Sequence, residues 1–165
     1  MEQEEREINT IYLDTGIFSF LHTASTKPEA MLFQSQIREF WLNEKYKYTL
    51  YASKSVRFEL LKGFYKHKLA SLRESFLVNI LKRTPEIDSI IDYYIEKKVM
   101  PKGKHGDAAH LAFASYYRID CILTFNFNNL ANPNKRTQME VINRQMGLEL
   151  PRIISPESLL SKSKE

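Results

Sequence analysis

Short apolar segments alternate with longer segments of helical periodicity along the chain, and this alternation constrains the fold more than any other feature. The apolar segments have the length and composition of buried strands. They are residues 8–13, 48–52, 99–101, 121–124 and 152–154. Because parallel neighbours need a long crossover connection, strands separated by helices predict a parallel sheet with helices on both faces. In such an open sheet, functional sites form at the carboxyl ends of the strands.

The segments between these strands carry apolar residues at helical spacing. They predict helices at residues 16–22, 28–45, 53–63, 66–83, 85–98, 106–117, 133–146 and 156–160. Pro28 falls in a first helical turn, and Gly63 and Gly147 fall where helices are expected to end. We find no internal repeat or linker in the sequence, so the pattern describes one α/β unit.

The length of 165 residues predicts a single domain. We expect that domain at residues 8–160, between an acidic N-terminal extension at 1–7 and a polar tail at 161–165. A composition of 43% hydrophobic and 27% charged residues argues against wholesale disorder. No apolar run approaches the roughly 20 residues that span a bilayer, and the acidic start does not resemble a secretory signal. The only cysteine, Cys121, cannot form an intramolecular disulfide, so we expect a cytoplasmic protein without a membrane partner.

The positive charge of the chain is concentrated in one stretch. Residues 44–83 contain ten Lys/Arg against three Glu, whereas the whole chain has a net charge of only +4. Such a stretch is either a solvated helix surface or the footprint of a nucleic acid. If it is a footprint, the candidate RNA-binding residues are Lys54, Arg57, Lys62, Lys66 and Lys68.

Three acidic residues occupy positions that the predicted topology brings toward one edge of the sheet. Asp14 ends the first strand, Glu59 lies in the helix after the second, and Asp107 lies in the first turn of the helix before the fourth. Thr124 and Asn126 stand at the end of that fourth strand. Converging carboxylates repel each other, and Mg²⁺ or Mn²⁺, which take oxygen ligands, would offset the repulsion. Taken singly, each acid also has an ordinary interpretation as a turn, cap or solvent-facing residue.

Other chemical signatures are weaker. His110 lies one helical turn after Asp107 on an alanine-rich helix and is interpreted as a packed histidine, while Asp120 precedes a strand and is interpreted as a turn residue. The Asp-Thr-Gly tripeptide at 14–16 also occurs in aspartic proteases, but these need a β-rich fold in which two such loops share a proton. The sequence contains no P-loop, dinucleotide-binding glycine motif, serine nucleophile elbow or Cys/His zinc cluster.

Several motifs in order resemble the PIN-domain ribonucleases of the VapC toxin type. They are IYLDT at 11–15, SVRFEL at 55–60, VMP at 99–101, DAAHLA at 107–112, DCILTFN at 120–126, LAN at 130–132 and GLELPRIISPESLL at 147–160. Each motif is short, but their order and spacing together cover nearly the whole chain. The resemblance implies a three-layer α/β/α sandwich, PIN-like, around a mainly parallel sheet of four to five strands.

The resemblance also assigns roles to particular residues. It implies that Asp14, Glu59 and Asp107 are the catalytic acids and that they bind Mg²⁺ or Mn²⁺. The fourth acidic position of the wider family falls on Asn126, whose neutral amide would bind the metal more weakly or through water. Thr124 and Thr15 would support these ligands by hydrogen bonding. The sequence departs from the branch at Asn129, where a histidine is common.

The function that the resemblance implies is metal-dependent endonucleolytic cleavage of RNA by the toxin of a type II toxin–antitoxin pair. The implied partners are the RNA substrate, a cognate antitoxin protein and a second copy of the chain in a homodimer. Two alternatives remain open. The amides at Asn126 and Asn129 are compatible with a catalytically weakened or silent module that binds RNA or a protein partner. A related metallonuclease that acts on DNA, or in RNA processing without being a toxin, would share the same motifs.

Overall fold

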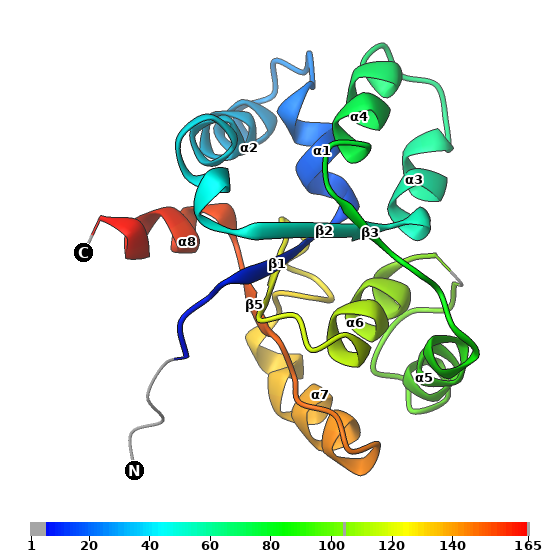
Figure 1. Ribbon diagram of the computed structural model, residues 1–165. Helices are drawn as coiled ribbons and strands as arrows, with labels where there is room; N and C mark the ends of the chain where they lie inside the picture. Colours follow the sequence, from blue (N-terminus) through cyan, green and yellow to red (C-terminus); the bar gives the residue numbers. More distant parts are fainter. Residues whose placement is uncertain (1–5, 104, 165) are drawn as a thin grey trace.

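The computed structural model describes residues 6–103 and 105–164, and it contains a five-stranded, all-parallel sheet with the order β3-β2-β1-β4-β5 (Figure 1). The strands are β1 (Thr10–Leu13), β2 (Thr49–Ser53), β3 (Asn79–Leu81), β4 (Cys121–Leu123) and β5 (Arg152–Ile154). The predicted parallel α/β architecture is confirmed. Most of the predicted acidic extension, residues 1–7, lies outside the described residues.

Helices cover both faces of this sheet, with α1 to α4 on one side and α5 to α7 on the other (Figure 1). The helices are α1 (Thr15–Leu21), α2 (Pro28–Glu39), α3 (Lys54–Leu61), α4 (Lys68–Ser75), α5 (Pro85–Glu96), α6 (Asp107–Tyr116), α7 (Pro133–Gln145) and α8 (Pro156–Ser163). A π turn at Phe40–Glu44 and a 3₁₀ turn at Lys45–Lys47 continue α2, so the segment predicted as one helix changes its winding before β2. No described helix combines the length and apolarity needed to cross a membrane.

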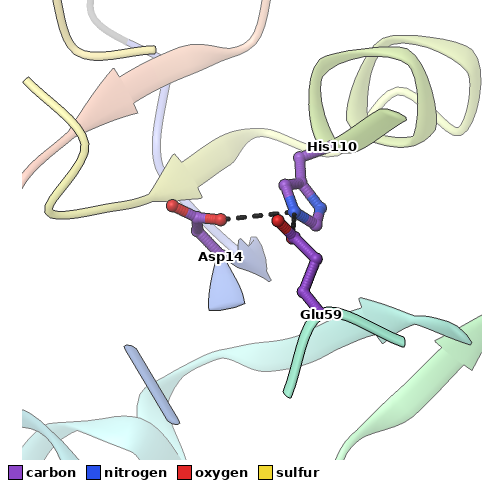
Figure 2. Close-up of side chains that lie close together, drawn as sticks. All are labelled: Asp14, Glu59 and His110. Carbon is purple, nitrogen blue, oxygen red and sulfur yellow. Dashed lines mark hydrogen bonds and ion pairs between the residues drawn. The ribbon is translucent and has the colours of Figure 1, made fainter. Parts of the chain in front are cut away.

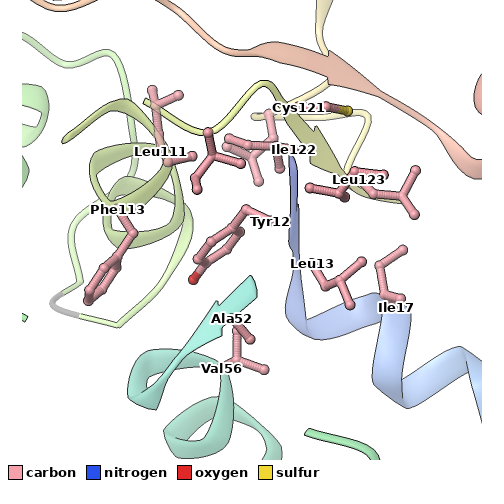
Figure 3. Packing of buried hydrophobic residues seen from close by; sticks show 14 of the residues in the cluster. Tyr12, Leu13, Ile17, Ala52, Val56, Leu111, Phe113, Cys121, Ile122 and Leu123 are labelled. Atoms are coloured by element: carbon pink, nitrogen blue, oxygen red, sulfur yellow. The ribbon is translucent and has the colours of Figure 1, made fainter. Parts of the chain in front are cut away.

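The central strand β1 explains why the first motif is so apolar. It pairs with β2 on one side and β4 on the other, with Ile11 opposite Leu50 and Cys121. Ile11, Tyr12 and Leu13 have no exposed surface. Successive side chains point to opposite faces: Tyr12 stacks on Phe113 of α6 at 6.4 Å between centroids, whereas Leu13 lies toward α1 (Figure 3). One short strand therefore contributes to the core on both faces of the sheet.

Two predictions for the middle of the chain are wrong. Residues 99–101 form no strand, because the amide of Val99 donates to the carbonyl of Tyr94 at 3.0 Å and closes the end of α5. The third strand, β3, lies instead inside the segment predicted as a single helix, 66–83. It is held by its ladder with β2 and by the Asn79 side chain, which donates to the carbonyl of Leu50 at 3.0 Å. Pairing with a strand that is distant in the sequence stabilises β3, and the periodicity of residues 66–83 alone does not reveal such pairing.

Candidate functional site

Three side chains meet at the carboxyl edge of the sheet, where β1, β2 and β4 end. Asp14, Glu59 and His110 each offer a ligand atom within 4.8 Å of the others (Figure 2). The imidazole Nε2 of His110 lies 2.5 Å from Oε1 of Glu59 and 3.4 Å from Oδ1 of Asp14. Two carboxylates and an imidazole from three separate elements therefore form one cluster.

Asp14 follows β1 directly, and its backbone is still extended, with φ −67° and ψ 158°. Its side chain caps α1 by accepting a hydrogen bond at Oδ1 from the Thr15 amide at 2.7 Å. The other oxygen, Oδ2, accepts from the Thr124 hydroxyl at 2.6 Å. The cap role expected from the sequence and the place in the cluster thus belong to the same carboxylate, which these two donors hold in one orientation.

Glu59 reaches the cluster from the middle of α3, the helix that starts immediately after β2. Its side chain is 27% exposed, so it is not the solvent-facing residue that α3 alone would suggest. Oε1 accepts a hydrogen bond from the Thr15 hydroxyl at 2.6 Å and also contacts His110. The hydroxyls of Thr15 and Thr124 therefore each donate to one of the two carboxylates.

His110 is fully buried on α6, and both of its ring nitrogens have partners. Nδ1 lies 2.7 Å from the hydroxyl of Tyr12, which lies 2.8 Å from the hydroxyl of Ser53. Because a phenol hydroxyl can both donate and accept a hydrogen bond, Tyr12 can pair with Nδ1 of either the neutral or the charged imidazole. The sequence interpretation of a packed, satisfied histidine is right about burial, but it missed the contact with Glu59. The available signal was the spacing of one helical turn from Asp107.

Burial and mutual charge shift the pKa values of this cluster in different directions. Burial, with help from Asp107 and Glu59, raises the pKa of Asp14 against the opposing effects of His110 and Thr124. Burial also opposes ionisation of Glu59 and His110, but their hydrogen bond and the surrounding charges outweigh it. The pKa of Glu59 is therefore lowered and that of His110 is raised. Glu59 and His110 consequently form a partly buried ion pair beside Asp14.

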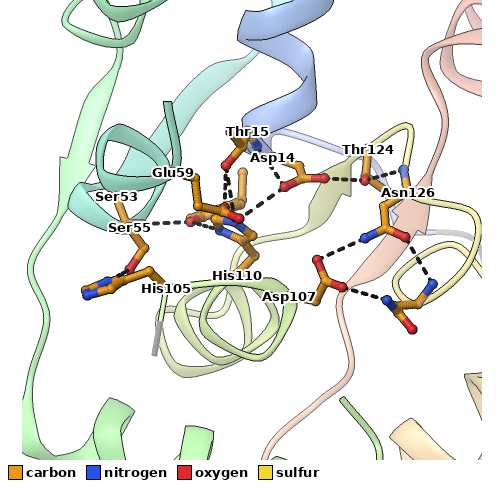
Figure 4. A network of polar contacts seen from close by, with 12 residues as sticks. Asp14, Thr15, Ser53, Ser55, Glu59, His105, Asp107, His110, Thr124 and Asn126 are labelled. Atoms are coloured by element: carbon orange, nitrogen blue, oxygen red, sulfur yellow. Dashed lines mark hydrogen bonds and ion pairs between the residues drawn. The ribbon is translucent and has the colours of Figure 1, made fainter. Parts of the chain in front are cut away.

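Asp107 borders the same polar network but is not one of the three clustered side chains (Figure 4). Its Oδ1 accepts from the side-chain amide of Asn126 at 2.9 Å, and its Oδ2 accepts from that of Asn129 at 2.8 Å. Nζ of Lys135 donates to Oδ1 of Asn129 at 3.0 Å. Asn126 is also fixed by its backbone amide, which donates to the Thr124 hydroxyl at 2.9 Å. The structure therefore joins Asp14 and Glu59 closely and holds Asp107 and Asn126 as an adjoining pair.

No protein-family model matches the chain, and no curated protein sequence matches it. Several solved structures do. VapC20 from Mycobacterium tuberculosis, described as a sarcin-ricin loop cleaving toxin, is 17% identical, with a TM-score of 0.57 over 74% of this chain and 95% of that one. FitAB bound to an IR36 DNA fragment is 14% identical, with a TM-score of 0.52 over 88% and 94%. VapBC-1 from nontypeable Haemophilus influenzae is 18% identical, with a TM-score of 0.51 over 90% and 98%.

The chain has the PIN-type α/β/α fold of these solved structures. The resemblance drawn from the sequence motifs is confirmed at the level of the fold, including the α/β/α layers and the parallel sheet. In this chain, the carboxylates at the strand ends come from the motifs at 11–15 and 55–60, and Asp107 and His110 share the motif at 107–112.

The candidate RNA-binding residues of the chain differ in their surroundings. Arg57 and Lys68 are engaged by their own fold: the Arg57 guanidinium lies 3.9 Å from the Phe76 ring centroid, and Lys68 donates to the carbonyl of Leu61 at 2.9 Å. The others are exposed at the surface of α3 and of the segment after it, and they are Lys54, Lys62 and Lys66. Of these three exposed lysines, Lys62 also contacts its own fold, with Nζ 5.0 Å from the Phe58 ring centroid.

Proposed function

We propose that this PIN domain is a metal-dependent endoribonuclease and the toxin of a type II toxin–antitoxin pair. The observation that carries the proposal is the convergence of Asp14, Glu59 and His110 within 4.8 Å at the carboxyl edge of a PIN-type sheet. The likeness to VapC20, a toxin described as cleaving the sarcin-ricin loop, supports RNA as the substrate. The likeness to the VapBC-1 structure supports a cognate antitoxin as partner. A cytoplasmic homodimer belongs to the same proposal.

The donor set suits a small divalent cation. Asp14 and Glu59 would supply oxygen ligands, and Nε2 of His110 could be a third ligand only in its neutral form, in place of its ion pair with Glu59. Oxygen donors suit Mg²⁺ and Mn²⁺, and imidazole is acceptable to Mn²⁺. When bound, such an ion acts as a Lewis acid on phosphate oxygens and makes a coordinated water more acidic.

The residues around the cluster orient its groups before substrate arrives. Thr15 and Thr124 donate one hydrogen bond each to separate oxygens of Asp14, so the carboxylate cannot rotate freely. Glu59 is held by Thr15 and His110. Before a cation binds, burial raises the pKa of Asp14, while His110 and Thr15 lower that of Glu59. A carboxylate of the cluster would accept the proton of the attacking water.

The test is cleavage of RNA by the purified protein with Mn²⁺ or Mg²⁺ and, in parallel, with EDTA. Asp14→Asn keeps an acceptor for the Thr15 amide, and its new amide can donate to Thr124, so the variant should fold while losing at least about 100-fold in cleavage. Asp92→Asn is the matched control, because Asp92 is an exposed acid on α5, and it should cleave normally. Undiminished cleavage by Asp14→Asn, or cleavage that EDTA does not suppress, would contradict the proposal.

One observation favours a second candidate function, a silent module that binds RNA or a protein partner. Both carboxylate oxygens of Asp107 already accept amide hydrogen bonds from Asn126 and Asn129, so this acid is committed to its neighbours. A silent module would bind RNA or the antitoxin without producing cleavage products at millimolar Mn²⁺. A product ladder that disappears with chelator would exclude it.

A further inference from the structure

An exposed aromatic ring stands next in the sequence to one of the clustered carboxylates. Phe58 precedes Glu59 on α3 and is 46% exposed. Its ring lies beside the imidazole of His105, with 4.1 Å between centroids and 34° between planes. His105 stands two residues before Asp107, so each ring adjoins a residue that belongs to the polar network. Figure 4 shows His105 at the opposite end of that network from Asn126.

The His105 ring is held by a buried anchor. Its Nδ1 lies 3.1 Å from the hydroxyl of Ser55, a residue that is only 1% exposed. The guanidinium of Arg83 approaches both groups, with Nη1 at 3.4 Å from the Ser55 hydroxyl and 3.5 Å from Nδ1 of His105. Phe58 therefore rests on a second ring whose position is fixed, which lowers the cost of ordering a flat surface for a ligand.

A cation completes this arrangement. Lys62 follows Phe58 by one helical turn, and its Nζ lies 5.0 Å from the Phe58 ring centroid. A flat apolar ring with an adjacent cation is the combination that binds a nucleobase and its phosphate. Phe64 and Phe76 are also exposed beside cations, but neither adjoins a clustered carboxylate in the sequence.

We propose that Phe58, supported by His105, is a stacking site for an unpaired base of the RNA next to the phosphate that is cleaved, with Lys62 contacting an adjoining phosphate. This inference rests on the proposed function, because it names how the substrate is placed at the same carboxylates. A base inside a continuous helix has no free face for the ring, so the site selects positions where a base is unstacked.

The test measures binding of a short, fluorescein-labelled single-stranded RNA by anisotropy, with EDTA present to suppress metal-dependent cleavage. Phe58→Leu keeps the apolar bulk and removes the flat ring, and it should weaken binding about 5- to 100-fold. Phe58→Trp should retain binding. Phe64→Leu is the matched control on the same basic surface, and it should change affinity less than about twofold. The dependence of affinity on salt should be unchanged in Phe58→Leu, whereas Lys62→Ala should lower the slope by about 0.7.

Abasic substitutions give the test its specificity. At one nucleotide position, removal of the base should weaken binding to the wild type and leave the affinity of Phe58→Leu unchanged. Three results would each overturn the stacking site. The first is equal RNA affinity of wild type and Phe58→Leu, and the second is an equal loss of affinity in Phe58→Leu and Phe64→Leu. The third is that the loss from each abasic substitution adds to the loss from Phe58→Leu at every nucleotide position. If the wild type still cleaves RNA with Mn²⁺, the proposed function survives such a result. If the wild type neither binds nor cleaves RNA, both proposals fail together.

Discussion

Replacing His110 by leucine removes a buried imidazole that contacts Glu59 at 2.5 Å and Tyr12 at 2.7 Å. A hydrogen bond between charged groups contributes about 1.5–3 kcal/mol. The lower half of that range applies here, because the Glu59 side chain is 27% exposed and water replaces part of the contact. The Tyr12 hydroxyl keeps Ser53 as a partner, so its loss adds only about 0.5–1 kcal/mol. We expect a loss of about 2–3 kcal/mol in the free energy of unfolding, or roughly 4–12 °C in Tm.

The loss in the free energy of unfolding caused by His110→Leu should depend on pH. Folding raises the pKa of His110, so the stabilisation from its charge is complete below the ordinary value of 6.5 and disappears as the pH rises through the folded value. Folding lowers the pKa of Glu59, so its contribution is present above the ordinary value of 4.5 and disappears as the pH falls through the folded value. The difference between wild type and variant should therefore be largest between about pH 4.5 and 6.5.

The measurement is denaturant unfolding followed by circular dichroism, with EDTA present, across this pH range. His110→Gln offers an N–H donor without the charge, and it should fall between the wild type and His110→Leu. An unchanged free energy of unfolding in His110→Leu, or a difference that grows as the pH rises above 6.5, would refute the ion pair with Glu59.

Three further predictions concern the buried thiol of Cys121, the hydroxyl of Thr124 and the exposed lysines. Burial raises the pKa of Cys121 to about 12, so the thiol should resist iodoacetamide at pH 8 in the native protein and react only in denaturant. Mass spectrometry would detect the alkylation, and rapid alkylation of the native protein would contradict the burial of the thiol. Thr124→Val removes the hydroxyl that donates to Asp14 at 2.6 Å and should cost about 1.5–3 kcal/mol in denaturant unfolding; a neutral result would mean that the contact is unimportant. Alanine at Lys54, Lys62 and Lys66 together should reduce the salt dependence of RNA binding by about two in slope without lowering Tm, and an unchanged slope would place the RNA elsewhere.

The fold could be predicted largely from the sequence because its central strands are marked by burial on both faces. The segments that became β1, β2, β4 and β5 were recognisable as short apolar segments, and the helices between them required parallel pairing. The edge strand β3 was not recognisable. Asn79–Leu81 is only three residues long, and pairing with β2 fixes it, which local periodicity does not reveal.

Two of the three predicted acids, Asp14 and Glu59, lie in the cluster that the structure forms, whereas Asp107 adjoins it and His110 was not predicted there. Asp14 and Glu59 were identifiable because each follows a predicted strand end, and the topology brings those ends together. His110 was not, because an imidazole on an alanine-rich helix has the same appearance whether it packs against apolar groups or contacts a carboxylate. The hydrogen bonds that hold Asp107 were also not predictable. Asn129 donates to Asp107 across 22 residues of sequence, and Lys135 donates to Asn129 across six.

The central claim is that Asp14 and Glu59 hold a divalent cation, and crystals soaked in Mn²⁺ test it most directly. We predict an anomalous difference peak about 2.1 Å from an oxygen of each carboxylate, and no such peak in Asp14→Asn crystals. Crystals that take up Mn²⁺ at other positions but show no peak between these two side chains would contradict the account.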